Sequence, residues 1–236
     1  MTAVTALTAQ NTLGVHGVMG VPPTFIREQI GVVLADLGAD AIKTGMLHAA
    51  PVIEAVCDEL AARARGIPLV ADPVMVAKGG HPLLAPDAVE TLKARLLPLA
   101  TVITPNLPEA EVLTGRPIRD LADMREAAAA LRALGVPAVL LKGGHLEGDA
   151  VTDLRDTADA TEEFDSPRIA TRHTHGTGCT LASAVAAGLA QGMSLRDSVM
   201  RARAYVRAAI AAAPGYGAGH GPLDHAVTFD PGRVPG

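Results

Sequence analysis

The sequence of 236 residues contains no tryptophan, and aromatic residues make up only 2% of it. Proteins that bind single-stranded nucleic acid stack bases on aromatic side chains, so this scarcity argues against that function. The formal net charge of -5 likewise disfavours a nucleic-acid partner or an anionic membrane surface. Any bound phosphate group is therefore expected to be held locally, by a few backbone N–H groups and a lysine.

Cysteine is also scarce, and Cys57 and Cys179 are the only two. The chain has no disulfide framework and no paired-cysteine zinc pattern, which favours a cytoplasmic location. No basic residue precedes Arg27, so the N-terminus is unlike a secretory signal. The uncharged residues 176–195 have the length of a membrane span, but their Gly, Ser, Thr and Gln content favours a buried helix.

Several catalytic motifs are absent. The dipeptide Gly-Lys never occurs, so there is no Walker A loop, and the protein-kinase glycine loop, HExxH and GxSxG are missing too. A phosphate-handling enzyme with this sequence needs another way to hold phosphate.

The hydrophobic content of 49% predicts a folded protein with a large core. Apolar strands are predicted at 2–9, 40–46, 67–71, 101–103 and 138–141. Helices are predicted from Pro22–Pro23 onward and at 51–64, 86–97, 121–134, 181–193 and 195–213. A strand meander is predicted at 151–154, 162–164 and 169–171. In the first helix, the residues predicted to face inward are Phe25, Ile26, Ile30, Val33, Leu34 and Leu37. This alternation predicts one α/β domain over residues 1–236, with a mostly parallel sheet and helices on both faces.

Polar residues stand where the predicted strands end. They are Lys43, Asp72, Asn106 with Glu109, and Lys142. Each has a structural explanation of its own, such as turn chemistry at Asp72 or a helix cap formed by Asn106 and Glu109. Together they point to the ligand-binding edge of an open α/β sheet, with oxygen ligands for Mg²⁺ and a lysine for phosphates.

The turn Gly176-Thr177-Gly178 opens into a helix of small residues. Unpaired N–H groups at a helix N-terminus favour an anion, and glycines let a ligand approach them closely. Cys179 lies in the first turn, where the helix dipole is expected to lower the pKa of its thiol. The structural alternative is a flexible loop before a core helix. The turn is the best candidate in this sequence for a phosphate cradle.

Six ordered motifs resemble those of one family. They cover residues 8–12, 43–47, 72–78, 104–110, 141–145 and 174–180, and residues 221–225 form its usual closing motif. The chain thereby resembles the hydroxymethylpyrimidine/phosphomethylpyrimidine kinases of thiamine biosynthesis, which have the ribokinase-like three-layer α/β/α fold. The resemblance implies phosphorylation of 4-amino-5-hydroxymethyl-2-methylpyrimidine and then of its monophosphate, with ATP and Mg²⁺. It also suggests a homodimer.

The resemblance assigns a role to each candidate residue. Cys179 would be the base, and Gly176, Thr177 and Gly178 would form the anion hole, although the wider superfamily usually has Asp at the position of Cys179. Gln10 would hydrogen-bond the aminopyrimidine, in a pocket lined by Met46 and Val74. Lys142, with Asn106 and Gly143, would hold ATP. Asp72, Asn106 and Glu109 would organise the metal directly or through water.

The chain departs from the family at its beginning. Family members start with a further strand and a glycine-rich loop of the type A-G-x-D-x-S-G-G-A-G, which the sequence lacks. We expect either an incorrectly chosen start codon or a truncated sequence, and an in-frame upstream sequence that encodes this strand and loop would support the expectation.

Three other interpretations stay open. The first is a pyridoxal or pyridoxine kinase of the same fold. The second is a non-catalytic protein that binds nucleotide or pyrimidine. The third is a metal site formed by His173, His175 and Cys179.

Overall fold

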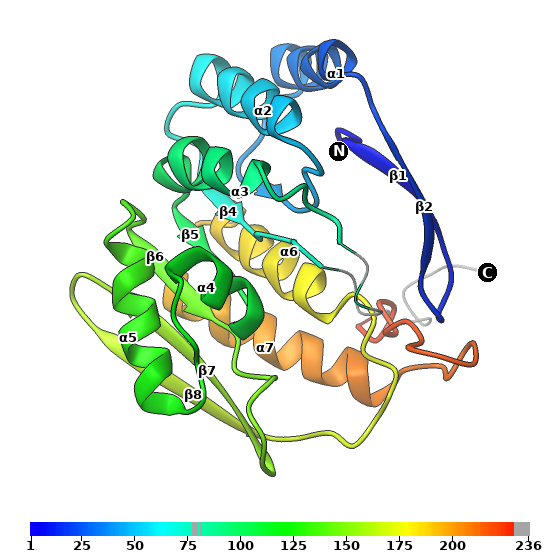
Figure 1. The fold of residues 1–236 in the computed structure, drawn as a ribbon, viewed down its shortest axis with the longest axis vertical. Helices are drawn as coiled ribbons and strands as arrows, with labels where there is room; N and C mark the ends of the chain where they lie inside the picture. The colour runs from blue at the N-terminus through cyan, green and yellow to red at the C-terminus, as the bar shows by residue number, and fades with distance from the viewer. Residues whose placement is uncertain (77–79, 81, 229–236) are drawn as a thin grey trace.

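The structure is a computed structural model that describes residues 1–76, 80 and 82–228. A six-stranded sheet has the order β3-β4-β5-β6-β7-β8 (Figure 1). Its strands are β3 (Ile42–Thr44), β4 (Leu69–Ala71), β5 (Val102–Ile103), β6 (Ala138–Leu141), β7 (Ala150–Thr157) and β8 (Thr161–Pro167). Strands β3 to β6 are parallel, whereas β7 and β8 are antiparallel. The mostly parallel α/β architecture is confirmed, and the antiparallel pair is the predicted meander without its third strand at 169–171.

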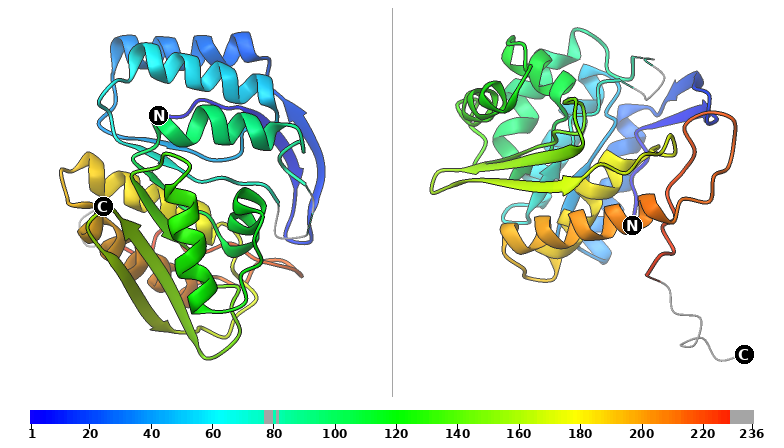
Figure 2. Two further views of the ribbon diagram at one scale, coloured as in Figure 1. Left: turned by 60° about the vertical axis from the view of Figure 1, so that its left-hand side comes forward. Right: turned by 90° about the horizontal axis from the view of Figure 1, so that it is seen from below.

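Helices cover both faces of this sheet (Figure 2). One face packs against α6 (Thr177–Ala190) and α7 (Leu195–Ala211). The other packs against α1 (Pro23–Asp36), α2 (Ala50–Arg63), α3 (Ala88–Thr91), α4 (Leu107–Thr114) and α5 (Leu121–Arg132). In β4, Val70 packs on the face that α6 and α7 cover, whereas Leu69 and Ala71 pack on the opposite face. Burial on both faces explains why these strands are apolar throughout.

Some predicted helices differ from those observed. Helix α4 was not predicted, apart from the cap at Asn106. The helix predicted at 86–97 is α3 followed by a π-helical turn, Leu92–Leu96, and a 3₁₀ turn, Leu97–Leu99. Phe25 and Leu37 do not face inward: they are 53% and 66% exposed, whereas Ile26 is fully buried. Leu37 lies past the last turn of α1, and Phe25 is rotated about 100° from Ile26 around the helix.

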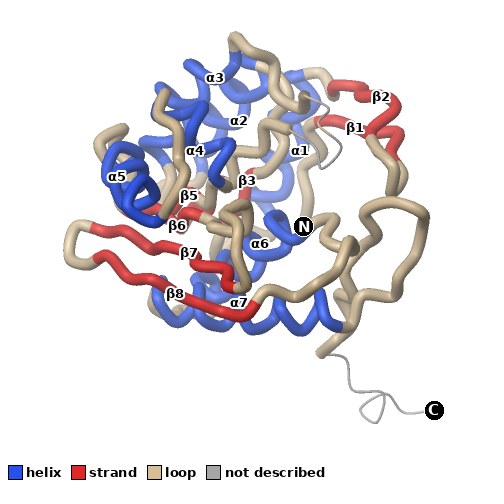
Figure 3. Tube along the Cα trace, turned by 60° about the horizontal axis from the view of Figure 1, so that its bottom comes forward, coloured by secondary structure: helices blue, strands red, loops and turns tan. Residues whose placement is uncertain are grey.

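The N-terminal strand is the largest correction. Residues predicted to form a strand of the main sheet instead form β1 (Ala6–Gln10), which pairs antiparallel with β2 (Val15–Gly20) in a separate hairpin (Figure 3). Strand β2 was not predicted. The Asn11 side chain accepts N–H bonds from Leu13 (2.9 Å) and Gly14 (3.2 Å), which builds the connecting turn. A short apolar run has the same composition in a hairpin as in a core strand, so composition could not separate the two.

Two expectations about burial can be compared with the structure. Cys57 is buried in the core at 1% exposure, as predicted. The uncharged run contains α6, which packs against the sheet. Within the described part of the chain, no helix has both the length and the apolarity to cross a bilayer.

Helices α6 and α7 approach each other closely at Gly188. A Cβ atom there would lie 2.5 Å from Ser198 Oγ and 3.0 Å from Ser198 Cα. By contrast, a Cβ at Gly31 of α1 would meet only the Arg63 guanidinium, at 3.8 Å or more. Close packing therefore requires glycine at position 188, whereas position 31 has room for a side chain.

We predict that Gly188→Ala lowers the free energy of unfolding by about 1–3 kcal/mol, because the added methyl group overpacks the helix crossing. Gly31→Ala is the matched control, and should raise stability by up to about 1 kcal/mol through helix propensity. Urea unfolding of both variants measures the difference. Equal effects would contradict the close approach.

Candidate active site

Polar side chains from β3 to β6 meet at the carboxyl end of the sheet. Lys43 lies in β3, Asp72 directly follows β4, and Lys142 directly follows β6. Asn106 follows β5, and a parallel bridge joins it to Lys142. We call this edge, formed by Lys43, Asp72, Asn106 and Lys142, the strand-end rim. It is the edge at which open α/β sheets bind ligands.

Asp72 is the most enclosed charge of the rim, with 2% of its surface exposed. Its Oδ1 accepts hydrogen bonds from Lys142 Nζ (2.9 Å) and Thr104 Oγ1 (3.0 Å), and its Oδ2 lies 3.9 Å from Lys43 Nζ. Burial lowers the pKa of Lys142, but Asp72 and Glu109 raise it by more, so the net shift is upward. The rim therefore holds a charged lysine in a largely dry environment.

Glu109 joins the rim through the start of α4. Asn106 Oδ1 accepts the Glu109 N–H (2.9 Å), and Glu109 Oε2 accepts the Asn106 N–H (2.8 Å), which forms the capping box considered above. Burial is the main cause that raises the pKa of Glu109 to about 7, while Lys142 and the Asn106 N–H oppose the shift. The structural explanation for these residues is thus correct, and the Glu109 carboxyl group also interacts with the charges of Lys142 and Asp72.

The glycine turn lies against the same rim. A Cβ atom on Gly178 would be 2.9 Å from Lys142 Nζ. Gly176 has a φ of 83°, which favours glycine, and no side chain caps the N-terminus of α6. Thr177 Oγ1 donates to the Thr174 carbonyl (2.8 Å) and so fixes the turn. The structure therefore brings the predicted anion cradle and the predicted phosphate-binding lysine into contact.

Cys179 lies at the rim as expected, but the pKa of its thiol differs from the expectation. Its side chain is exposed, and its charge interactions are with Lys43, Asp72, Lys142 and Glu109, so it belongs to the rim. Its pKa is raised, not lowered: desolvation by surrounding atoms is the largest cause, and Asp72 and Glu109 oppose the two lysines. The expected lowering of the thiol pKa is therefore wrong for this structure.

The predicted substrate residues lie on two parts of the fold. Met46 and Val74 follow β3 and β4, and both are half-buried at the rim. Gln10 ends β1 on the hairpin and is exposed. The Met46 carbonyl accepts the Thr5 hydroxyl (2.7 Å), which ties the base of the hairpin to the rim. Ala77 and Lys78, the last residues of the motif at 72–78, lie outside the described residues.

Gly143 has a structural reason to be glycine. A Cβ atom there would lie 1.8 Å from the Thr152 carbonyl oxygen, and its N–H donates to Asp153 Oδ1 (3.1 Å). Its amide is therefore bonded within the protein, and a direct bond from it to ATP stays a prediction.

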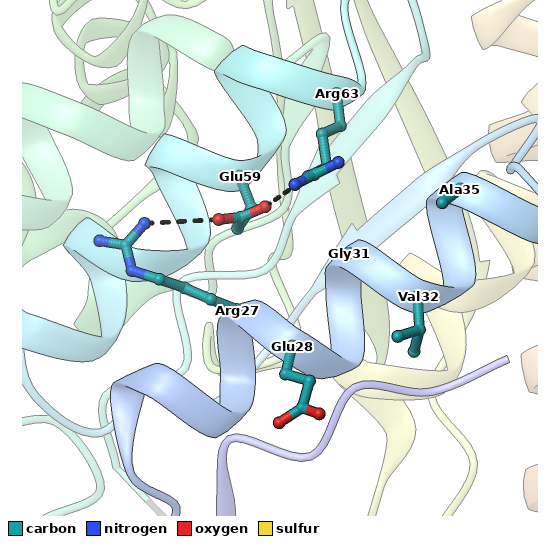
Figure 4. A pocket seen from close by; sticks show the side chains of 7 residues that line it. All are labelled: Arg27, Glu28, Gly31, Val32, Ala35, Glu59 and Arg63. Carbon is teal, nitrogen blue, oxygen red and sulfur yellow. Dashed lines mark hydrogen bonds and ion pairs between the residues drawn. The ribbon is translucent and has the colours of Figure 1, made fainter.

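Two other regions do not form the site. In the described part of the chain, no three His, Cys, Asp or Glu side chains converge as metal ligands, so His173, His175 and Cys179 are not a zinc site. A groove between α1 and α2 is lined by Arg27, Glu28, Gly31, Val32, Ala35, Glu59 and Arg63 (Figure 4). Its arginines pair with Glu59, and none of its lining residues belongs to the strand-end rim.

His225 was not predicted to act on the site. Thr180 gives its hydroxyl proton to the Gly176 carbonyl (2.8 Å), so His225 Nε2 must be the donor in its 3.0 Å bond to Thr180 Oγ1. The His175 N–H also donates to the Gly221 carbonyl (3.1 Å). The segment at 221–225 therefore holds the glycine turn in place through these two hydrogen bonds. In the sequence, its position as the closing motif was the feature that pointed to this segment.

The fold and this rim, which lacks a P-loop, define a kinase of the ribokinase-like class. Residues 1–224 match the phosphomethylpyrimidine kinase family. The chain therefore belongs to the phosphomethylpyrimidine kinase family.

Individual relatives agree with this assignment. A hydroxymethylpyrimidine/phosphomethylpyrimidine kinase of Streptomyces coelicolor is 50% identical over 95% of the chain and 82% of that protein. The thiamine biosynthesis bifunctional protein ThiED of Geobacter sulfurreducens is 53% identical over 96% of the chain, which spans only 46% of that protein. The structure of an ADP complex of Bacillus subtilis pyridoxal kinase aligns with a TM-score of 0.88 at 35% identity, covering 97% of this chain and 86% of that one.

The raised pKa of Glu109 predicts how stability depends on pH. Between pH ~4.5 and ~7 the folded chain keeps Glu109 protonated while the unfolded chain has lost that proton, so the free energy of unfolding should fall as pH rises. The total fall should be about 3 kcal/mol, and the contribution should be constant above pH ~7.

Glu109→Gln keeps the capping box without the titration, so the difference between wild type and this variant isolates the effect. Urea unfolding at pH 5 and 7.5, without divalent cations, measures it. Parallel pH profiles for the two proteins would contradict the raised pKa.

Proposed function

We propose that this chain transfers the γ-phosphoryl group of ATP to 4-amino-5-hydroxymethyl-2-methylpyrimidine, and then phosphorylates the monophosphate to the diphosphate. The contact between Lys142 and Gly178 is the observation that carries the proposal, because it places a cation beside the N-terminus of α6, which no side chain caps. Membership of the family supports the pyrimidine substrate, and the related kinase solved with ADP supports the nucleotide.

The residues of the rim have different roles in the phosphoryl transfer. Lys142 and Lys43 neutralise phosphate charge, and the N–H groups of Gly178 and Cys179 face the transferred group. The substrate hydroxyl oxygen bonds to the γ-phosphorus, the bond to the bridging oxygen of ADP breaks, and Cys179 Sγ as thiolate takes the hydroxyl proton. Because the pKa of Cys179 is raised, the thiolate is a minor form at neutral pH. Positioning and electrostatics therefore carry most of the rate, as expected for a loose transition state.

Asp72 and Glu109 fit a Mg²⁺ ion held mainly through water. Asp72 Oδ1 accepts bonds from Lys142 and Thr104, Asp72 Oδ2 lies 3.9 Å from Lys43 Nζ, and Glu109 Oε2 accepts the Asn106 N–H, so water would link these carboxylates to the ion. Mg²⁺ commonly retains several waters and uses one or two carboxylates. When bound, it would neutralise charge on the ATP phosphates. Asn106 would support this site by holding Glu109.

The pyrimidine pocket is proposed on the side of the rim that faces the hairpin. Met46 and Val74 would line it, and Gln10 would hydrogen-bond the amino group of the ring. The bond between Thr5 and the Met46 carbonyl supports this arrangement, because it fixes the hairpin beside the end of β3.

The resemblance also predicts a homodimer. Leu7 and Met19 are directly opposite each other on the hairpin and are 49% and 62% exposed, so they supply an apolar surface for such contact. Light scattering of the purified chain measures the oligomeric state.

The substrate is tested by measuring ADP formation with the hydroxymethylpyrimidine and with pyridoxal side by side. We expect kcat/KM to be at least about tenfold higher for the pyrimidine. The match to a pyridoxal kinase structure makes pyridoxal the second candidate, and a ratio in its favour would replace the proposal. Stabilisation by both ligands without ADP formation would instead show a binding protein.

The role of Cys179 is tested with Cys179→Ala. We expect kcat to fall by about 10²-fold, at the lower end of the range for acid–base catalysis, with little change in KM for ATP. Cys57→Ala is the matched control, since Cys57 is buried in the core and should affect stability more than kcat. An unchanged kcat for Cys179→Ala would remove the thiol from the mechanism.

A further inference from the structure

A buried arginine on α7 lies close to the residue that follows Lys142. Arg203 is 9% exposed, and arginine is rarely buried unless its charge is paired. Its Nε donates to Asp153 Oδ2 (2.8 Å), and its Nη2 donates to the Phe164 carbonyl and to Ser166 Oγ (3.2 Å). The guanidinium carbon also lies 5.5 Å from the centre of the Phe164 ring. These contacts fix Arg203 against β7 and β8.

Asp153 extends this contact to the rim. It lies in β7, one residue before Leu154, which pairs with Leu141 at the end of β6. One carboxylate oxygen binds Arg203, and the other accepts the N–H of Gly143 (3.1 Å). The side chain thus connects α7 to the residue immediately after Lys142.

The backbone at Lys142 is held from both neighbouring strands. On one side its own N–H donates to the Pro105 carbonyl (2.9 Å), in the segment that follows β5. On the other side Gly143 packs so closely on β7 that a Cβ atom would meet the Thr152 carbonyl at 1.8 Å. From this fixed backbone the Lys142 side chain reaches Asp72 and Gly178.

We propose that Asp153 and Arg203 are positioning residues, which hold Gly143 against β7 and so direct Lys142 toward the phosphates of the nucleotide. Neither residue is placed in contact with substrate, and because their charges cancel, they act through geometry. This proposal rests on the nucleotide-binding role given to Lys142 above.

A purely structural ion pair offers a control on the same strand. Asp156 in β7 is 6% exposed, and its Oδ2 lies 3.5 Å from Arg132 Nη1. It pairs with Val139, toward the opposite end of β6 from Lys142. Asp153 and Asp156 therefore match in strand and burial, and each faces an arginine, although only Asp153 is hydrogen-bonded to it. They differ in their connection to the rim.

The test compares Asp153→Asn, Asp153→Ala and Asp156→Ala in the full chain. For Asp153→Ala we expect KM for ATP, and Kd for ADP by calorimetry, to rise about tenfold, since small misplacements of a binding group have large effects. KM for the pyrimidine should change less than about twofold, and Asp156→Ala should leave all three within about twofold. Asp153→Asn keeps an acceptor for the Gly143 N–H and should give an intermediate effect. This variant also provides the test if Asp153→Ala does not fold.

Amide exchange at Gly143 gives a readout that needs no turnover, and it should speed up in Asp153→Ala and not in Asp156→Ala. Equal changes in the two alanine variants, or equal changes in both KM values for Asp153→Ala, would overturn the proposal. A wild type that binds ADP but phosphorylates neither the hydroxymethylpyrimidine nor pyridoxal would contradict the proposed function alone, because ADP binding and Gly143 exchange still report on Lys142.

Discussion

The ion pair between Lys142 and Asp72 is the interaction on which the site depends. Two residues separated by 70 positions in sequence meet at 2.9 Å because β4 and β6 lie on either side of β5. Neither charge is stable alone in so enclosed a place, so each fixes the other. The pair keeps Lys142 charged and extended over the glycine turn before any phosphate arrives. A phosphate that enters there competes with Asp72 for the lysine without needing a new conformation of the backbone.

Charge is organised locally around this pair. The chain has a formal net charge of -5, and its rim combines two lysines with the carboxylates of Asp72 and Glu109. Burial raises the pKa of Glu109 to about 7, so its charge responds to any cation that binds nearby. The rim can therefore accept both phosphate and a divalent cation, which a uniformly basic patch could not do. The support comes from outside the rim, from His225 behind the glycine turn and from Arg203 and Asp153 beside Lys142.

The sequence predicted the parts of the fold that depend on local patterns. Strand β6 was predicted at its observed residues, 138–141, because a strand buried on both faces is a continuous apolar run. The positions of Asp72 and Lys142 followed from where such runs end. The hairpin was missed because its alternating pattern is short and interrupted by glycine, and α4 because it has only eight residues.

Contacts between residues that are far apart in the sequence were harder to predict from it. The bond between Thr180 and His225 spans 45 positions, and the bond between Asp153 and Arg203 spans 50. Arg203 shares the buried face of α7 with Val199 and Val206. A charged residue among apolar residues at helical spacing indicates a buried and paired charge, so its burial could have been predicted from the sequence. The pKa of Cys179 was misjudged because the helix dipole was considered without desolvation, which is the largest cause of the raised pKa.

The central claim is that the glycine turn and Lys142 grip the transferred phosphoryl group together. A crystal structure of the chain with Mg²⁺ and a non-hydrolysable ATP analogue tests it most directly. We expect γ-phosphate oxygens within hydrogen-bonding distance, about 3 Å, of the N–H groups of Gly178 and Cys179 and of Lys142 Nζ. A nucleotide bound with its phosphates away from this turn, while Lys142 stays paired with Asp72, would contradict the account.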